Sequence, residues 1–296
     1  MNKIYLKALL LIGSVCLLSA NGNAQINPMG ASFFQNQYQF NPAMAGLTDK
    51  KVALNFGFKA QWNALPGAPF EGSVTADYGA SDHVGLGVNL YNEKAGLIKS
   101  LRALGTYVYR VKFNPEGSKQ LRFGLSVGVS NEWIDPNDVI GSNADPLVSQ
   151  FNQRSAYLDG DFGIAYTGER LTIQGAVPRL KKFLNRDDDL STFDYETFYS
   201  AVSYKFSSNG GLNVEPMLCY RGIHGMDNIV DFGANATLLN EQLILMAMYH
   251  TTKSTTFGLG MNFRQKFTIN GMFTTENPMM QGYTAGEFEV NLKFHL

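Results

Sequence analysis

The stretch Leu121–Ser130 (LRFGLSVGVS) alternates strictly between apolar residues and small or polar ones. Successive side chains of a β-strand point to opposite faces, so this period of two predicts a strand with one apolar and one polar face. Residues 101–113 alternate in the same way, and the turn signal Asn114-Pro115-Glu116-Gly117 follows them. Two consecutive strands joined by a tight turn predict an antiparallel hairpin.

The same alternation recurs along most of the chain. It predicts fourteen strands, at 52–62, 70–78, 84–90, 101–113, 121–130, 158–166, 171–177, 198–206, 212–220, 230–238, 243–249, 255–263, 267–273 and 286–296. So many strands with no helices between them must close into a barrel or split into two packed sheets.

Three features favour a membrane barrel over a soluble sandwich. The polar faces combine glycine with charged residues, as a water-facing lumen does, and aromatic residues such as Trp62, Tyr107 and Tyr166 lie near predicted strand ends. The connections loosely alternate between short turns and longer loops such as 135–155, and the last strand ends in Phe294 and Leu296. We therefore predict an all-β fold: a transmembrane antiparallel β-barrel of the outer-membrane type, with about 14 strands over residues 51–296.

The N-terminal residues 1–24 have the layout of a cleavable signal peptide. Two lysines precede an apolar run at 8–18, and Gly22-Asn23-Ala24 supplies small residues before the expected cleavage point. Export through this signal and the predicted barrel place the protein in the outer membrane. Residues 25–50 contain several aromatic residues but no room for a strand, so we expect this N-terminal segment to fold into the lumen as a plug.

Composition excludes several classes of function. The 296 residues carry 24 Lys and Arg against 25 Asp and Glu, which leaves no basic field for nucleic acid. The two cysteines are Cys16, within the signal peptide, and Cys219, so the mature chain has neither a disulfide nor a cysteine zinc site.

No catalytic or cofactor constellation is visible. Gly124-Leu125-Ser126-Val127-Gly128 fits the G-x-S-x-G pattern, but it lies within an alternating strand and not at a strand-to-helix turn. The four histidines have no metal-site spacing; they are His83, His224, His250 and His295. We predict a protein that is not an enzyme and binds no metal or cofactor. A barrel hydrolase would require a serine, a histidine and an acid to converge near one mouth.

Four basic residues are predicted to face the lumen: Arg102, Arg110, Lys112 and Arg122. They either form an anion-attracting lining or are neutralised by inward-facing acids. The acids that fit this second interpretation are Glu71, Asp77, Asp159 and Asp161.

The segment before the first strand is the most distinctive one. Phe40-Asn41-Pro42-Ala43, followed by Ala45 and Gly46, resembles the opening of PorP/SprF proteins of the type IX secretion system of Bacteroidetes. Met44 departs from this pattern, since the family often has an aromatic residue there. The resemblance continues in segments 161–166, 174–178, 214–221 and 231–236.

This resemblance implies an outer-membrane barrel that serves type IX secretion, gliding motility or the surface attachment of an adhesin. The implied partners are outer-membrane lipid and either a secreted or surface protein with a C-terminal sorting domain or periplasmic secretion components. It supplies no catalytic residues. The alternative function is a passive porin or small-solute channel, which an open lumen with the four basic residues unpaired would favour.

Overall fold

The computed structural model describes residues 31–47, 51–62, 67–139, 146–153, 155–184, 196–208, 211–223, 227–264, 266–276 and 286–296. The predicted signal peptide at 1–24 lies outside these residues. Within the described part of the chain, no helix is long and apolar enough to cross a bilayer.

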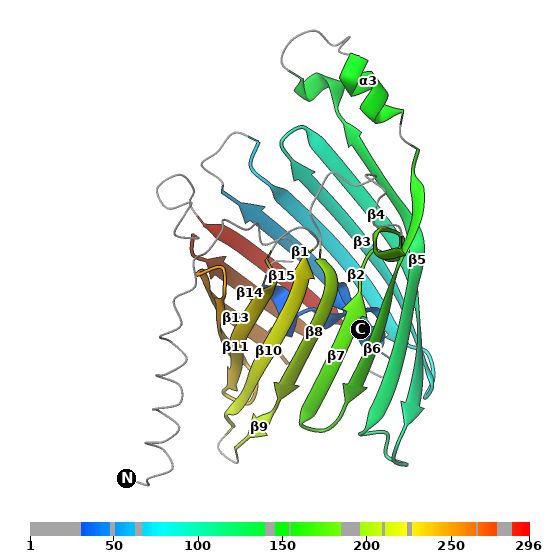
Figure 1. Ribbon diagram of the computed structural model, residues 1–296. Helices are drawn as coiled ribbons and strands as arrows, with labels where there is room; N and C mark the ends of the chain where they lie inside the picture. The colour runs from blue at the N-terminus through cyan, green and yellow to red at the C-terminus, as the bar shows by residue number, and fades with distance from the viewer. Residues whose placement is uncertain are drawn as a thin grey trace.

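The strands form one antiparallel ring (Figure 1). They are β1 (Val52–Gln61), β2 (Phe70–Gly79), β3 (Val84–Ala95), β4 (Ile98–Lys112), β5 (Gln120–Ile134), β6 (Tyr157–Thr167), β7 (Leu171–Val177), β8 (Glu196–Tyr204), β9 (Phe206–Ser207), β10 (Asn213–Ile223), β11 (Ile229–Leu238), β12 (Leu243–His250), β13 (Thr255–Phe263), β14 (Phe267–Thr274) and β15 (Glu287–His295). Because β9 continues the register of β8 against β10, the two form a single strand. The predicted 14-stranded barrel is thus confirmed.

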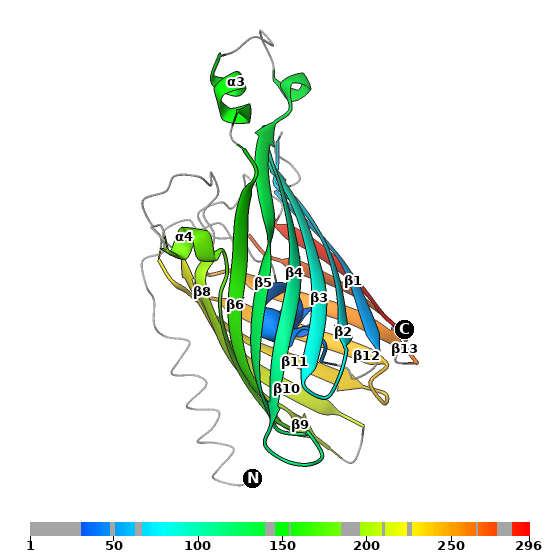
Figure 2. The same cartoon turned by 90° about the vertical axis from the view of Figure 1, so that its right-hand side faces the viewer.

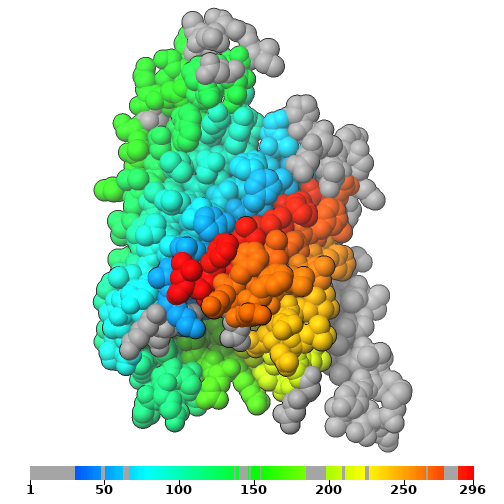
Figure 3. All heavy atoms as spheres, turned by 180° about the vertical axis from the view of Figure 1, so that it is seen from behind, coloured from blue at the N-terminus to red at the C-terminus, as the bar shows by residue number. Residues whose placement is uncertain are grey.

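The ring closes between the first and last strands. β1 pairs with β15 from Ala53 opposite His295 to Gln61 opposite Glu287, and β10 also pairs with β11. Figure 3 shows the blue first strand against the red last strand on one continuous wall. Every strand therefore has two neighbours, and the sheet has no free edge along its length.

The two faces of the wall follow the predicted alternation. On β5, Leu125 and Val127 are 47% and 56% exposed on the outside, whereas Ser126 between them is 2% exposed and faces inward. An apolar outer surface around a polar interior is the reverse of a soluble domain and is typical of a barrel that lies in lipid.

The wall is uneven in height. β4 and β5 have 15 residues each, but β7 has seven. Figure 2 shows the tall strands rising to helix α3 (Pro146–Asn152), while the short helix α4 (Leu180–Leu184) lies beside the shorter strands. We call this end the long-loop rim and the opposite end, with its tight turns and the C-terminus, the short-turn rim.

The tall strands extend beyond the predicted ranges. β3 continues to Ala95, β4 begins at Ile98 and β5 continues to Ile134. The polar residues there, such as Asn92 and Lys94 of β3, interrupt the apolar outer face, so the sequence pattern ends before the strands do.

Residues 31–46, the internal segment, lie within the ring. They form the short turns η1 (Ser32–Phe34), α2 (Gln37–Phe40) and η2 (Pro42–Met44). These are the blue turns inside the strands in Figure 2.

Candidate functional site

Asn41 both shapes the internal segment and ties it to the wall. Its Oδ1 accepts a hydrogen bond from the Ala43 amide at 2.9 Å, which caps the η2 turn that Pro42 begins. Its Nδ2 donates to Oε1 of Gln174 on β7 and to the carbonyl oxygen of Ile164 on β6, each at 3.2 Å. One fully buried amide thus joins the turn to two strands.

Glycines of the wall make room for this turn. A Cβ on Gly124 of β5 would overlap the backbone of Pro42 and Ala43, and a Cβ on Gly163 of β6 would overlap Asn41 Oδ1. On β3, a Cβ on Gly85 would come within 2.8 Å of the Ala45 carbonyl oxygen. The inner wall is therefore hollowed to the shape of the segment.

The end of the turn is held by two charged side chains. Arg122 of β5 donates from Nε to the carbonyl oxygen of Ala43 at 2.7 Å and from Nη2 to that of Ala45. Asp77 of β2 accepts from the Gly46 amide at 2.7 Å. Gly46 has φ of 66° and leaves no space for a Cβ near Tyr78, so a glycine is required there.

Further polar bonds hold the earlier part of the segment. Nδ2 of Asn36 donates to Thr75 at 3.0 Å, and the Tyr38 hydroxyl bonds to Thr106 at 2.7 Å. The Ala31 amide donates to Oε1 of Glu289 on β15 at 2.7 Å. The contacts thus reach round the ring from β15 through β2 and β4 to β7.

The opposite side of the segment is apolar. The Phe33 ring stacks on Phe40 with ring centres 4.6 Å apart, and each of these rings lies 6.0 Å from Tyr199 of β8. Methionines of β10, β12 and β14 belong to the same buried cluster: Met217, Met246, Met248 and Met272. Flexible thioethers adapt to irregular space, which suits a wall that packs on a non-repeating segment.

The four predicted lumen charges lie on the inner face and have partners. Arg102 binds Asp159 at 3.0 Å and Asp161 at 2.7 Å. Arg110 donates to the carbonyl oxygens of Ser81 and Val84, and Lys112 lies 3.1 Å from the exposed Asp82. Arg122 binds the internal segment as described above.

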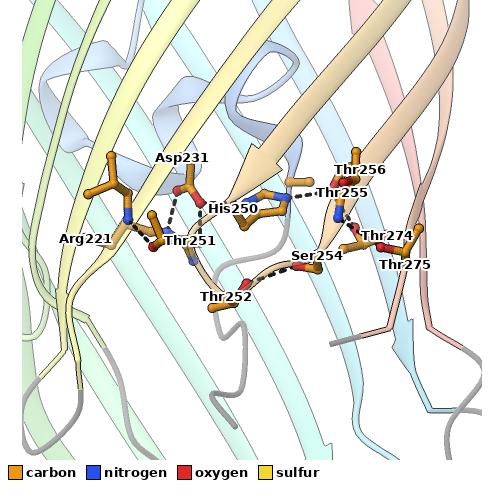
Figure 4. A network of polar contacts seen from close by, with 12 residues as sticks. Arg221, Asp231, His250, Thr251, Thr252, Ser254, Thr255, Thr256, Thr274 and Thr275 are labelled. Carbon is orange, nitrogen blue, oxygen red and sulfur yellow. Dashed lines mark hydrogen bonds and ion pairs between the residues drawn. The ribbon is translucent and has the colours of Figure 1, made fainter. Parts of the chain in front are cut away.

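A second buried network spans β10 to β14 (Figure 4). Arg221 donates from Nε to Asp231 Oδ2 at 2.8 Å and from Nη2 to Oδ1 at 2.9 Å. Nδ1 of His250 lies 2.6 Å from Asp231, and its Nε2 lies 2.8 Å from the Thr256 hydroxyl. The Arg221 guanidinium also lies 5.6 Å from the Phe33 ring centre, so this network supports the internal segment from the other side.

An acid, a histidine and a hydroxyl in a row have the order of a hydrolase triad, but the hydroxyl of this row is buried. Thr256 is fully buried and its hydroxyl bonds to Thr274 at 2.7 Å. No reacting atom can reach it, because a nucleophile needs open space beside it. The row is a structural link between strands.

The remaining predicted chemical motifs are dispersed. Ser126 lies within β5 and bonds to Thr106 at 2.6 Å. His83 lies at the β2–β3 turn, His295 ends β15, and His224 is outside the described residues. Across the described ranges, the histidine, cysteine and acidic side chains form no group suited to a metal ion.

Sequence reasoning did not identify the glycines that shape the wall or the Arg221–Asp231–His250 network. From the sequence alone, glycine on the polar face indicates only a lumen. The available signal was that Gly85, Gly124 and Gly163 share the inner face with charged residues, which indicates close approach of another backbone.

The fold and the site together define a class. The chain is a closed membrane β-barrel, apolar outside, whose interior holds a segment of its own N-terminal region. The sequence profile of the type IX secretion system membrane protein family PorP/SprF matches residues 22–294. The chain belongs to this family.

Two solved structures are similar to this chain. The Acinetobacter baumannii outer membrane protein Omp33 is 8% identical, with 84% of this chain and 100% of that chain covered and a TM-score of 0.48. The TodX deltaS2S3 mutant monoaromatic hydrocarbon channel is 11% identical, with 90% and 93% covered and a TM-score of 0.48. A search of curated proteins found no significant match.

Proposed function

We propose that this outer-membrane barrel serves the secretion or surface attachment of partner proteins in the type IX secretion and gliding system, with residues 31–46 closing its lumen. The observation that carries the proposal is the internal segment, which occupies inward-facing polar groups from β15 to β7. Because the polar groups inside the wall bind the protein's own chain, partner proteins would bind at the rims. The barrel would then serve to position those partners in the membrane. Family and barrel together imply a non-catalytic membrane protein.

The two rims would take different partners. Outer-membrane barrels have short periplasmic turns and longer extracellular loops, so the long-loop rim with α3 and α4 would face the cell surface. A secreted or surface protein with a C-terminal sorting domain would bind there. Periplasmic secretion components would bind the short-turn rim.

Affinity purification of the tagged protein from outer membranes, followed by mass spectrometry, tests this function. One variant replaces α3, residues 146–152, by a glycine–serine linker, and a matched variant replaces the short turn at 115–118. We expect loss of a surface protein with the first or of periplasmic components with the second. Recovery of no stoichiometric partner from the unchanged protein would contradict the proposal.

Closure of the lumen is tested by ion conductance in planar bilayers. We expect the unchanged protein to conduct little and a variant lacking residues 25–50 to conduct more. Equal conductance of the two folded proteins would contradict closure. The porin alternative would be favoured by unpaired basic residues around an opening, and Arg102, Arg110, Lys112 and Arg122 all have partners.

A further inference from the structure

The inner wall recognises the turn at residues 41–46 through a small set of side chains and glycines. We call this set the seat; it consists of Asp77, Gly85, Arg122, Gly124, Gly163 and Gln174. We propose that the seat is a peptide-binding site and that the internal segment is its tethered, exchangeable ligand. The ligand class is a short peptide with an Asn-Pro-Ala-x-Ala-Gly turn.

The wall does not use the internal segment to complete its sheet. Each strand of the ring pairs with two other strands, and residues 31–46 contribute no strand to that order. The backbone hydrogen bonds of the wall are therefore complete without the segment. The ring itself holds the seat residues in place, since they lie on β2, β3, β5, β6 and β7.

The seat recognises backbone conformation more than sequence. Arg122 binds two carbonyl oxygens, of Ala43 and Ala45, and Asp77 binds the Gly46 amide. The seat also selects the Asn41 side chain, because Gln174 accepts a hydrogen bond from its amide and Gly163 leaves room for its amide oxygen. Charge-assisted bonds to backbone groups in a fixed turn are a general means of peptide recognition.

In the sequence, the link between the internal segment and β1 is short and contributes no residue to the seat. Only residues 47–51 separate Gly46 from the start of β1 at Val52. A short tether gives the segment a high effective concentration, so a separate peptide competes only when the tether is cut. The intact protein would therefore keep its own segment bound.

The experiment uses the full chain with a site-specific protease site in place of residues 47–51. The protein is folded in detergent micelles, cut, and mixed with excess fluorescent peptide of residues 31–46. We expect the labelled peptide to co-elute with the folded, cut barrel and not with the uncut barrel. A peptide with Asn41→Ala and Gly46→Ala should bind roughly tenfold or more weakly, since it loses a buried amide and the left-handed turn.

A matched pair of barrel variants locates the site. Arg122→Met should weaken peptide binding to a similar extent, while Lys112→Met, whose partner is the exposed Asp82, should leave it unchanged. The altered peptide gives the same discrimination on an unchanged barrel, so the test does not depend on the folding of a barrel variant. Unfolding of the cut barrel, retention of its own segment without exchange, or equal binding of the altered peptide would each overturn the proposal.

Discussion

Gly163 of β6 faces Asn41 so closely that a Cβ on this glycine would lie only 1.9 Å from the amide oxygen. The wall and the internal segment are thus in direct contact at this position. A position of this kind cannot accept even a methyl group without displacing the turn.

Gly163→Ala should therefore lower the free energy of unfolding by about 1–3 kcal/mol, because overpacking forces a shift of the capped turn. The midpoint of urea unfolding, followed by the gel mobility of the folded barrel, measures this. Gly72→Ala is the matched control, since a Cβ there has no neighbour within 4 Å. Equal midpoints for the two variants would show that the turn is not held against β6.

Arg122→Met should also destabilise the protein, by roughly 1–3 kcal/mol for each buried carbonyl oxygen that loses its partner. Lys112→Met on the neighbouring strand removes a pair with an exposed carboxylate and should cost less than about 1 kcal/mol. Urea unfolding and protease digestion of the N-terminal region both follow the change. Identical behaviour of the two variants would contradict the role given to Arg122.

Asp231→Ala should be more severe. Arg221 and Asp231 are both fully buried, and removal of one partner of a buried ion pair leaves an uncompensated charge at a cost of roughly 3–5 kcal/mol. We expect a low yield of folded barrel. Asp82→Ala, which removes an exposed carboxylate, should fold normally, and a normal yield of both variants would refute the prediction.

Asp138, which lies beyond the tall strands in η3 (Pro136–Asp138), gives a pH dependence. Hydrogen bonds from Lys94, which has the larger effect, and from Lys99 lower the pKa of Asp138 below its ordinary value, because they favour the charged carboxylate. The pairing of the Asp138 carboxylate with the two lysines is fully present above the ordinary aspartate pKa of about 3.9. It is lost as the pH falls through the lowered pKa of Asp138. An NMR titration of the Asp138 carboxyl carbon tests it, and a pKa at or above 3.9 contradicts it.

Alternation predicted the strands because each residue of a barrel wall faces either lipid or the interior. The apolar Leu125 and the polar Ser126 show by their own polarity which side of the wall each faces, whatever strand lies beside them. The partners of Arg122 have no such local pattern, since they are carbonyl oxygens that any residue supplies. Asp231 and His250 meet only through the register of β11 and β12, which alternation leaves undetermined. The sequence left open whether Arg102 lines an anion-attracting lumen or is neutralised by acids, and the structure pairs it with Asp159 and Asp161.

The pairing of β1 with β15 makes closure of the ring depend on both ends of the strand region. The second neighbour of the first strand is the last strand, so a chain that stops before residue 287 exposes two unpaired strand edges. Ala31 binds Glu289 on that last strand, 258 positions away, so this bond can form only once the last strand has been made. Closure of the barrel therefore requires the whole polypeptide, and the bond between Ala31 and Glu289 joins its two ends inside the ring.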